Sequence, residues 1–146
     1  MISTHVSSEV QTIVNLAKEF ARQYGLNYVG TEHLVLAVVC EQDGVAARVL
    51  ADLGVDEDRA KACIDELTKD RMQETWVMGR LPGTPHFRDV LTHAAQAAKG
   101  TGNWQIHSEH LTIALLCEKS STGFRALRAL GVTLEGFRRA LANYRP

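Results

Sequence analysis

The segment Thr31-Glu32-His33-Leu34 recurs later in the chain as Ser108-Glu109-His110-Leu111, and the two copies are offset by 77 residues. A single register that holds without a gap over many positions indicates an internal duplication. Further matched segments keep the same offset: Cys40-Glu41 with Cys117-Glu118, and Leu53-Gly54-Val55 with Leu130-Gly131-Val132.

Two predicted repeats follow from this register, residues 6–67 and residues 83–144, separated by a linker of residues 68–82. In the linker the helical spacing of apolar residues breaks down, and Gly79 and Pro82 interrupt the chain. We therefore expect a single domain, residues 1–146, that is built from two similar halves.

Each repeat has the pattern of four helices. We expect Gly25 to end the first helix and Thr31 to cap a second one, which is apolar on all sides and therefore buried. A third helix follows Gly44 and ends near Gly54, and Asp56 can cap a fourth. The first helix shows apolar residues at three- and four-residue spacings: Val6, Val10, Ile13, Val14, Ala17, Phe20, Ala21 and Tyr24.

The second repeat predicts the same plan, with Pro85 near the first helical position and with Ser108 and Thr133 as caps. The predicted fold class is all-α: two tandem four-helix repeats with pseudo-twofold symmetry, about eight helices in all.

Composition excludes several classes of protein. The 146 residues are 45% hydrophobic and 23% charged with a formal net charge of -1, which argues against disorder and against nucleic acid as a partner. No apolar run has the length of a membrane span. The three cysteines Cys40, Cys63 and Cys117 form no C-x-x-C pair and lie in apolar contexts, so we expect buried thiols in the cytoplasm, without disulfides or a zinc knuckle.

Three segments keep a fixed order and spacing: residues 30–34 (GTEHL), 41–50 (EQDGVAARVL) and 53–55 (LGV). Together with the duplication they closely resemble the double Clp-N motif of the Clp protein-unfolding ATPases, and most closely that of ClpC. The resemblance covers nearly the whole chain. It implies a recognition domain that recruits adaptor proteins or arginine-phosphorylated protein substrates to Clp unfoldase or protease components.

The resemblance also implies phosphoarginine pockets, one in each repeat. In the family the glutamate of G-T-E-H faces the guanidinium, and a threonine at the start of the first helix faces the phosphate with nearby backbone N–H groups. The corresponding residues are Ser7 with Glu32, and Thr84 with Glu109. A helix N-terminus suits a phosphate, and a carboxylate can pair with a guanidinium through two hydrogen bonds.

This chain departs from the family pattern at some of these positions. Val6-Ser7 replaces the usual Phe-Thr, and His107-Ser108 replaces Gly-Thr in the second repeat. Residues 120–123 (SSTG) replace the usual glycine-containing turn. These changes bear on affinity more than on fold.

Several of these residues also have a purely structural interpretation that requires no ligand. A glutamate in the first turn of a helix is stabilised by the helix dipole without any ligand. His33 and His110 suit packing or a side-chain-to-backbone hydrogen bond, because no metal-ligand spacing accompanies them. Arg48 and Arg125 fit side chains that bridge helices.

The chain contains no G-x-x-x-x-G-K-[ST] motif, so no P-loop ATPase site is predicted. No catalytic constellation, cofactor or metal is expected, and an enzyme that uses the paired Glu-His positions remains a minor alternative. A third possibility is a free-standing accessory protein, similar to the chloroplast ClpT proteins, that stabilises or regulates the Clp protease complex.

Overall fold

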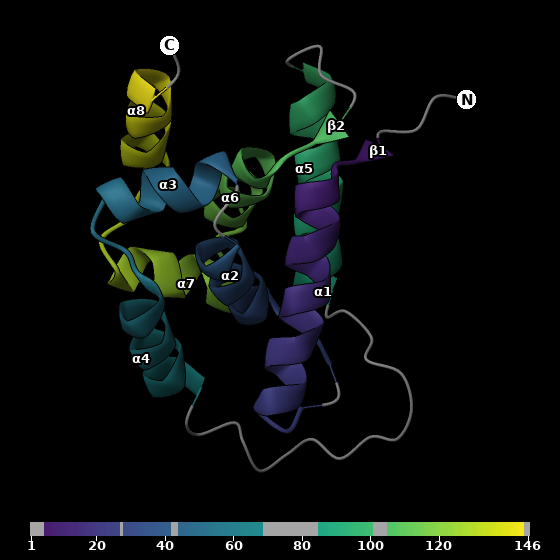
Figure 1. Cartoon of the computed structure of the whole chain (residues 1–146), viewed down its shortest axis with the longest axis vertical. Coiled ribbons are helices and arrows are strands. Elements are labelled where there is room, and N and C mark those ends of the chain that lie inside the picture. The colour runs from purple at the N-terminus through teal and green to yellow at the C-terminus, as the bar shows by residue number, and fades with distance from the viewer. Residues whose placement is uncertain (1–4, 27, 42–43, 69–84, 101–104, 145–146) are drawn as a thin grey trace.

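A computed structural model describes residues 5–26, 28–41, 44–68, 85–100 and 105–144, and these fold into eight helices and two short strands. The all-α prediction with four helices per repeat is confirmed (Figure 1). Repeat one holds β1 (His5–Val6), α1 (Ser8–Gln23), α2 (Thr31–Cys40), α3 (Val45–Asp52) and α4 (Glu57–Thr68). Repeat two holds α5 (Pro85–Gly100), β2 (Gln105–Ile106), α6 (Ser108–Cys117), α7 (Thr122–Ala129) and α8 (Leu134–Tyr144).

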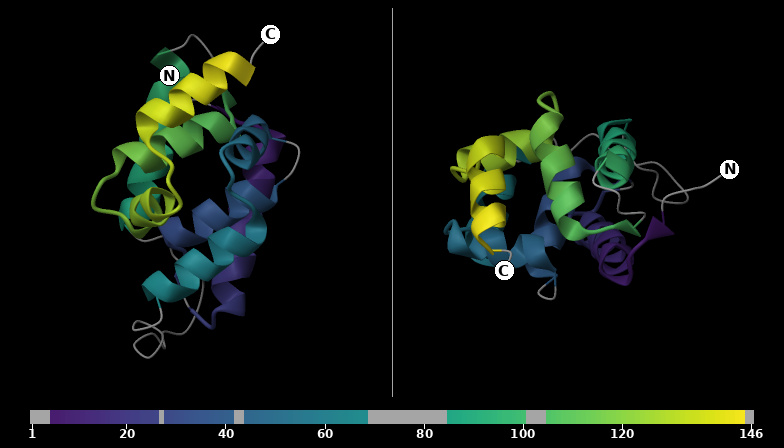
Figure 2. Two further views of the ribbon diagram at one scale, coloured as in Figure 1. Left: turned by 90° about the vertical axis from the view of Figure 1, so that its left-hand side faces the viewer. Right: turned by 90° about the horizontal axis from the view of Figure 1, so that it is seen from above.

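The second helix of each repeat, α2 or α6, lies at the centre of the molecule. Both are apolar on nearly every side, and their first eight and first five residues respectively are buried. α1 packs against α2 and α5 packs against α6, while the shorter helices cover the other side (Figures 1 and 2). A helix without a polar face must be enclosed by others, which explains this central position.

The two repeats exchange contacts reciprocally. α2 packs against α7 of the other repeat, and in the same way α6 packs against α3. β1 pairs in parallel with β2, with His5 opposite Gln105 and Val6 opposite Ile106. This strand pair, which the sequence did not predict, fixes the start of repeat one beside the start of α6.

Helix ends that depend on local sequence were predicted correctly. Gly25, Gly54 and Gly131 all have positive φ angles (74°, 89° and 88°) just after α1, α3 and α7. Asp56 Oδ1 accepts a hydrogen bond from the N–H of Arg59 (2.8 Å), and Thr133 plays the same part at α8. Each of these interactions joins residues only a few positions apart.

The predicted caps Thr31 and Ser108 are wrong. The N-cap residues of α2 and α6 are Gly30 and His107, one position earlier. Thr31 Oγ1 instead accepts the N–H of Gly123 in α7 (2.7 Å), and Ser108 Oγ accepts that of Ala46 in α3 (3.1 Å). Each side chain therefore caps a helix of the other repeat, so the two repeats are tied together by a pair of equivalent hydrogen bonds.

The expectation of three buried thiols is also wrong. Cys40 and Cys63 are partly buried, whereas Cys117 is exposed, because it lies at the end of α6 where the helix leaves the core. Of the predicted linker, only Thr68 is described, and it is the last residue of α4. None of the described helices has the length and apolar character needed to cross a membrane.

Candidate functional site

Glu32 is a buried carboxylate in the first turn of α2, with only 2% of the residue exposed. A β-carbon at Gly30 would collide with the Glu32 carboxylate, so glycine at this position makes room for it. His33 accepts the N–H of Gly30 at its Nδ1 (2.8 Å), as the side-chain-to-backbone interpretation predicted. The ring therefore carries its hydrogen on Nε2, and its role at this helix end is to hold the backbone turn.

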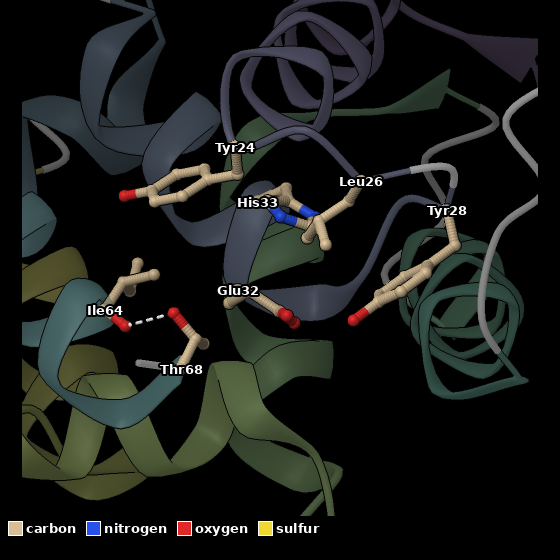
Figure 3. A pocket seen from close by; sticks show the side chains of 7 residues that line it. All are labelled: Tyr24, Leu26, Tyr28, Glu32, His33, Ile64 and Thr68. Carbon is tan, nitrogen blue, oxygen red and sulfur yellow. Dashed lines mark hydrogen bonds between the residues drawn. The ribbon is translucent and has the colours of Figure 1, made fainter. Parts of the chain in front are cut away.

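A small pocket opens beside the Glu32 carboxylate (Figure 3). Tyr24 and Tyr28 flank Glu32: the Tyr28 hydroxyl points toward the Glu32 carboxylate, whereas the Tyr24 ring points away from it, and both rings approach His33. The free space is about 10 Å³, which is room for about one water molecule. The full lining consists of Tyr24, Leu26, Tyr28, Glu32, His33, Ile64 and Thr68.

The wall formed by Tyr24 is held in place. Its hydroxyl donates a hydrogen bond to Asp65 Oδ1 (2.5 Å), which ties the end of α1 to α4. Burial, followed by this hydrogen bond and the charge of Asp65, raises the pKa of Tyr24 far above its ordinary value. The phenol therefore stays neutral, and the pocket combines one buried anion with aromatic surfaces, an arrangement suited to a planar cation such as guanidinium.

Glu109 takes the same position in α6, and it is 6% exposed. His110 Nδ1 accepts the N–H of His107 (2.9 Å), which repeats the arrangement of His33. The residue that matches Gly30 is His107, so the space that glycine leaves for Glu32 has no direct equivalent here.

Ser7 lies at the start of α6 and not in the Glu32 pocket. Its N–H donates to the carbonyl of Ile106 (3.1 Å), and its Oγ accepts the N–H of Val10 (3.3 Å) as the N-cap of α1. Tyr24, which lines the Glu32 pocket, follows the opposite end of α1, and the 16 residues between span about 24 Å. The predicted pairing of Ser7 with Glu32 is therefore wrong, because the structure brings Ser7 beside the helix that carries Glu109.

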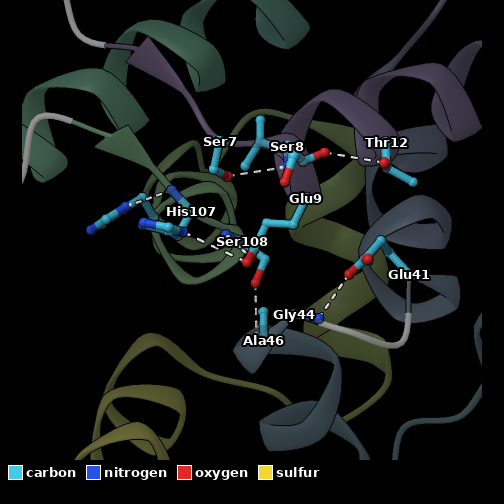
Figure 4. A network of polar contacts seen from close by, with 11 residues as sticks. Ser7, Ser8, Glu9, Thr12, Glu41, Gly44, Ala46, His107 and Ser108 are labelled. Atoms are coloured by element: carbon cyan, nitrogen blue, oxygen red, sulfur yellow. Dashed lines mark hydrogen bonds and ion pairs between the residues drawn. The ribbon is translucent and has the colours of Figure 1, made fainter.

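Glu9 is the polar residue of this region that the sequence did not single out (Figure 4). Its Oε2 accepts the N–H of Ser108 (2.9 Å) at the N-terminus of α6, and its Oε1 lies 3.6 Å from Nδ1 of His107. Nothing local to Glu9 reveals this role, because its partners are about a hundred residues away. Thr84, the match of Ser7 in repeat two, lies outside the described residues.

Comparisons with known proteins identify the family to which this fold belongs. A sequence model of the Clp repeat (R) N-terminal domain matches residues 5–82 and again residues 82–145. The chain is 34% identical over 119 residues to the chaperone protein ClpC1, chloroplastic, of Oryza sativa subsp. japonica. That match covers 82% of this chain but 13% of the relative, so the chain spans a small part of that protein's length.

Solved structures show the same fold at low sequence identity. The N-terminal domain of ClpD from Arabidopsis thaliana superposes with a TM-score of 0.79 at 18% identity, covering 98% of this chain and 96% of that one. The N-terminal domain of the ClpV1 ATPase from E. coli gives a TM-score of 0.69 at 19% identity, covering 92% and 82%. From the double match, the identity and the shared fold, the chain belongs to the family of Clp repeat N-terminal domains.

Proposed function

We propose that this domain is a non-catalytic recognition module that recruits substrates or adaptor proteins to a Clp-type ATP-dependent protease, and so acts in chaperone-assisted proteolysis. Support comes from its family and from relatives such as the ATP-dependent Clp protease ATP-binding subunit ClpA homolog of Trieres chinensis, 33% identical over 132 residues. The observation that carries the proposal is the buried Glu32 carboxylate in a pocket that Tyr24 and Tyr28 also line.

Phosphoarginine is the proposed ligand, as the resemblance to ClpC implies. Glu32 offers two carboxylate oxygens to a guanidinium, and Tyr24 or Tyr28 offers a ring on which the flat cation can stack. Because the pocket now holds space for about one water, entry of an arginine side chain requires a lining side chain to move.

The phosphate half of the ligand fits the N-terminus of α1. The first N–H groups of any α-helix have no partner within the helix, and here Ser7 takes up those of Val10 and Gln11 through its hydroxyl and carbonyl. A phosphate placed there would meet the N–H groups of Ser8 and Glu9. Since Ser7 lies beside α6, this pocket combines Ser7 with Glu109, one residue from each repeat.

Isothermal titration calorimetry with phosphoarginine tests the proposal, with arginine and inorganic phosphate as separate control ligands. Glu32→Gln and Glu109→Gln should each weaken one site by about 1.5–3 kcal/mol, the range for a hydrogen bond to a charged group. Glu19→Gln is the matched control, because that carboxylate is exposed and pairs only with Arg22 on the same helix. Circular dichroism shows whether each variant keeps its fold. Absence of heat at millimolar phosphoarginine in the wild type would exclude this ligand.

Ser7→Ala tests whether the site is shared between the repeats. Added to Glu109→Gln, it should weaken binding little further, because both residues belong to one site. Added to Glu32→Gln, it should weaken both sites. If Ser7→Ala instead weakens binding little further in Glu32→Gln but does so in Glu109→Gln, Ser7 shares a site with Glu32.

Partners are tested by co-purification with the tagged domain. A recognition module should retain adaptor proteins or arginine-phosphorylated substrates. Retention of the proteolytic core alone would instead favour an accessory protein that stabilises the protease. We place this activity in the cytoplasm, because the three cysteines are free thiols, as is typical of a reducing compartment.

A further inference from the structure

A cluster of metal-binding side chains lies between α5 and the end of α6. His86 and Asp89 of α5 and Glu118 at the C-terminal cap of α6 place their ligand atoms within 4.8 Å of one another. His93, one further turn along α5, brings its Nδ1 to 3.5 Å from Glu118 Oε2. The three α5 residues share one helix face, since they are three and four positions apart.

Two atoms of this cluster are buried without a hydrogen-bond partner among the described residues. These are His86 Nδ1 and Glu118 Oε2, the second of which lies 3.5 Å from Nδ1 of His93. A buried polar atom without a partner destabilises the fold, so a group that binds both atoms would stabilise it. Two imidazoles and two carboxylates together carry negative charge when the histidines are neutral, and this attracts a cation.

Comparison of the repeats shows why the cluster exists in only one of them. The residues that match His86, Asp89 and His93 are Glu9, Thr12 and Leu16, of which only Glu9 is a usual metal ligand. Glu9 is already engaged by the N–H of Ser108. Repeat one therefore lacks the ligand set.

The carboxylate of the matching glutamate also has a different task in each repeat. Glu41 Oε1 accepts the N–H of Gly44 (2.8 Å), the N-cap residue of α3, which has no side chain of its own. At the same place in repeat two stands Ser121, which caps α7 with its own hydroxyl by accepting the N–H of Phe124 (3.1 Å). The Glu118 carboxylate is directed toward α5 instead.

We propose that His86, Asp89 and Glu118, with His93 as the adjacent fourth ligand, form a binding site for a divalent transition metal of the zinc class. Imidazole and carboxylate ligands together favour zinc and its neighbours over magnesium or calcium. Zinc ligands in a tetrahedral site lie about 3.3 Å apart, so the cluster closes around the ion by small side-chain rotations. The ion would join the start of α5 to the end of α6. The proposal rests on these four side chains and not on phosphoarginine binding, although Thr84, which the resemblance assigns to a phosphoarginine pocket, lies two residues before His86.

Titration of the chelator-treated domain with zinc chloride tests the site, with calorimetry for affinity and thermal unfolding for stability. We expect saturation at one ion per chain and a Tm that rises with zinc concentration. His86→Ala and Glu118→Gln should each weaken binding at least about tenfold. Magnesium and calcium at the same concentration should leave the Tm unchanged.

Cys117→Ser is the matched control, because the exposed thiol beside Glu118 is the obvious alternative zinc ligand. Zinc affinity unchanged by this substitution supports the proposal. Affinity that is lost in Cys117→Ser, or that is unchanged in His86→Ala and Glu118→Gln, overturns it. Cobalt as a spectroscopic probe gives an answer that does not depend on stability, since a thiolate-to-cobalt band would also overturn the proposed ligand set.

Discussion

The third helices of the two repeats, α3 and α7, begin in different ways although they occupy equivalent places. α3 begins after Gly44, whose N–H is bound by the side chain of Glu41. α7 begins after Ser121, which supplies its own cap and leaves Glu118 to face α5. A single Gly-to-Ser difference at a helix start thus accompanies a change in the task of a carboxylate three residues earlier. Duplication preserved the helices, and divergence changed the uses of the polar groups between them.

A second difference concerns how closely the third helices approach their partners. α7 carries Gly123 where α3 carries Ala46, and both backbone N–H groups are bound by a hydroxyl from the other repeat. A β-carbon at position 123 would lie 2.9 Å from the Thr31 carbonyl oxygen and 2.9 Å from Leu115 Cδ2. Gly123 is therefore required by close backbone approach, whereas Ala46 fits its site with no exposed surface.

Gly123→Ala should produce the largest loss of stability. The backbone of α2 has to shift to accept the added methyl group, at a cost of about 1–3 kcal/mol. The gain in helix propensity, up to about 1 kcal/mol, offsets part of this cost. Urea denaturation measures the net effect, and Ala46→Gly is the reciprocal control with an expected loss of about 0.5–1 kcal/mol. A Gly123→Ala domain more stable than the wild type would contradict the close approach.

Removing either of the two reciprocal hydrogen bonds between the repeats should cause the next largest loss of stability. Thr31→Val and Ser108→Ala each leave a buried N–H of the opposite repeat without its acceptor, so each should destabilise the fold by about 1 kcal/mol. Equal losses would show that the two contacts are energetically equivalent. Thr133→Ala is a useful reference, because it removes an exposed cap within a single repeat. If Thr31→Val proves neutral, water or another group must satisfy the N–H of Gly123.

The last difference concerns Cys40 and Cys117, which occupy equivalent positions in the two repeats. It should affect the chemical reactivity of the thiols and have little effect on the stability of the fold. Burial, followed by a hydrogen bond with Glu57, raises the pKa of Cys40 to about 12, whereas Cys117 is exposed. Since only the thiolate is alkylated, Cys117 should react with iodoacetamide at pH 8 at least about tenfold faster than Cys40. Mass spectrometry of the alkylated peptides measures both rates in one sample.

The pH dependence of alkylation tests whether the raised pKa of Cys40 is the reason for its slower reaction. A raised pKa keeps Cys40 protonated, so its alkylation rate should still be increasing with pH well above pH 9. Glu57→Gln removes the carboxylate and should increase the rate of Cys40 while leaving that of Cys117 unchanged. The residue matching Glu57 in repeat two is Leu134, which provides no carboxylate near Cys117. Equal rates for both thiols in the folded wild type would show that burial does not protect Cys40.

The sequence by itself determined the duplication, the helices and most of their ends. Gly25, Asp56 and Thr133 act through neighbours a few residues away, so local spacing suffices to predict them. The resemblance singled out Glu32 and Glu109, and the sequence predicted either packing or a backbone hydrogen bond for their neighbouring histidines, which do make such hydrogen bonds.

Only the tertiary structure decided which distant residues meet. Thr31 binds Gly123, Ser7 lies beside α6, and Glu118 faces α5 because the repeats pack reciprocally around α2 and α6. The resemblance to the family pattern pairs Ser7 with Glu32, two residues of the same repeat. The strand pair β1–β2 joins the repeats and gives Ser7 to the other copy's helix. Such partners depend on packing between segments far apart in the chain, and no local periodicity encodes them.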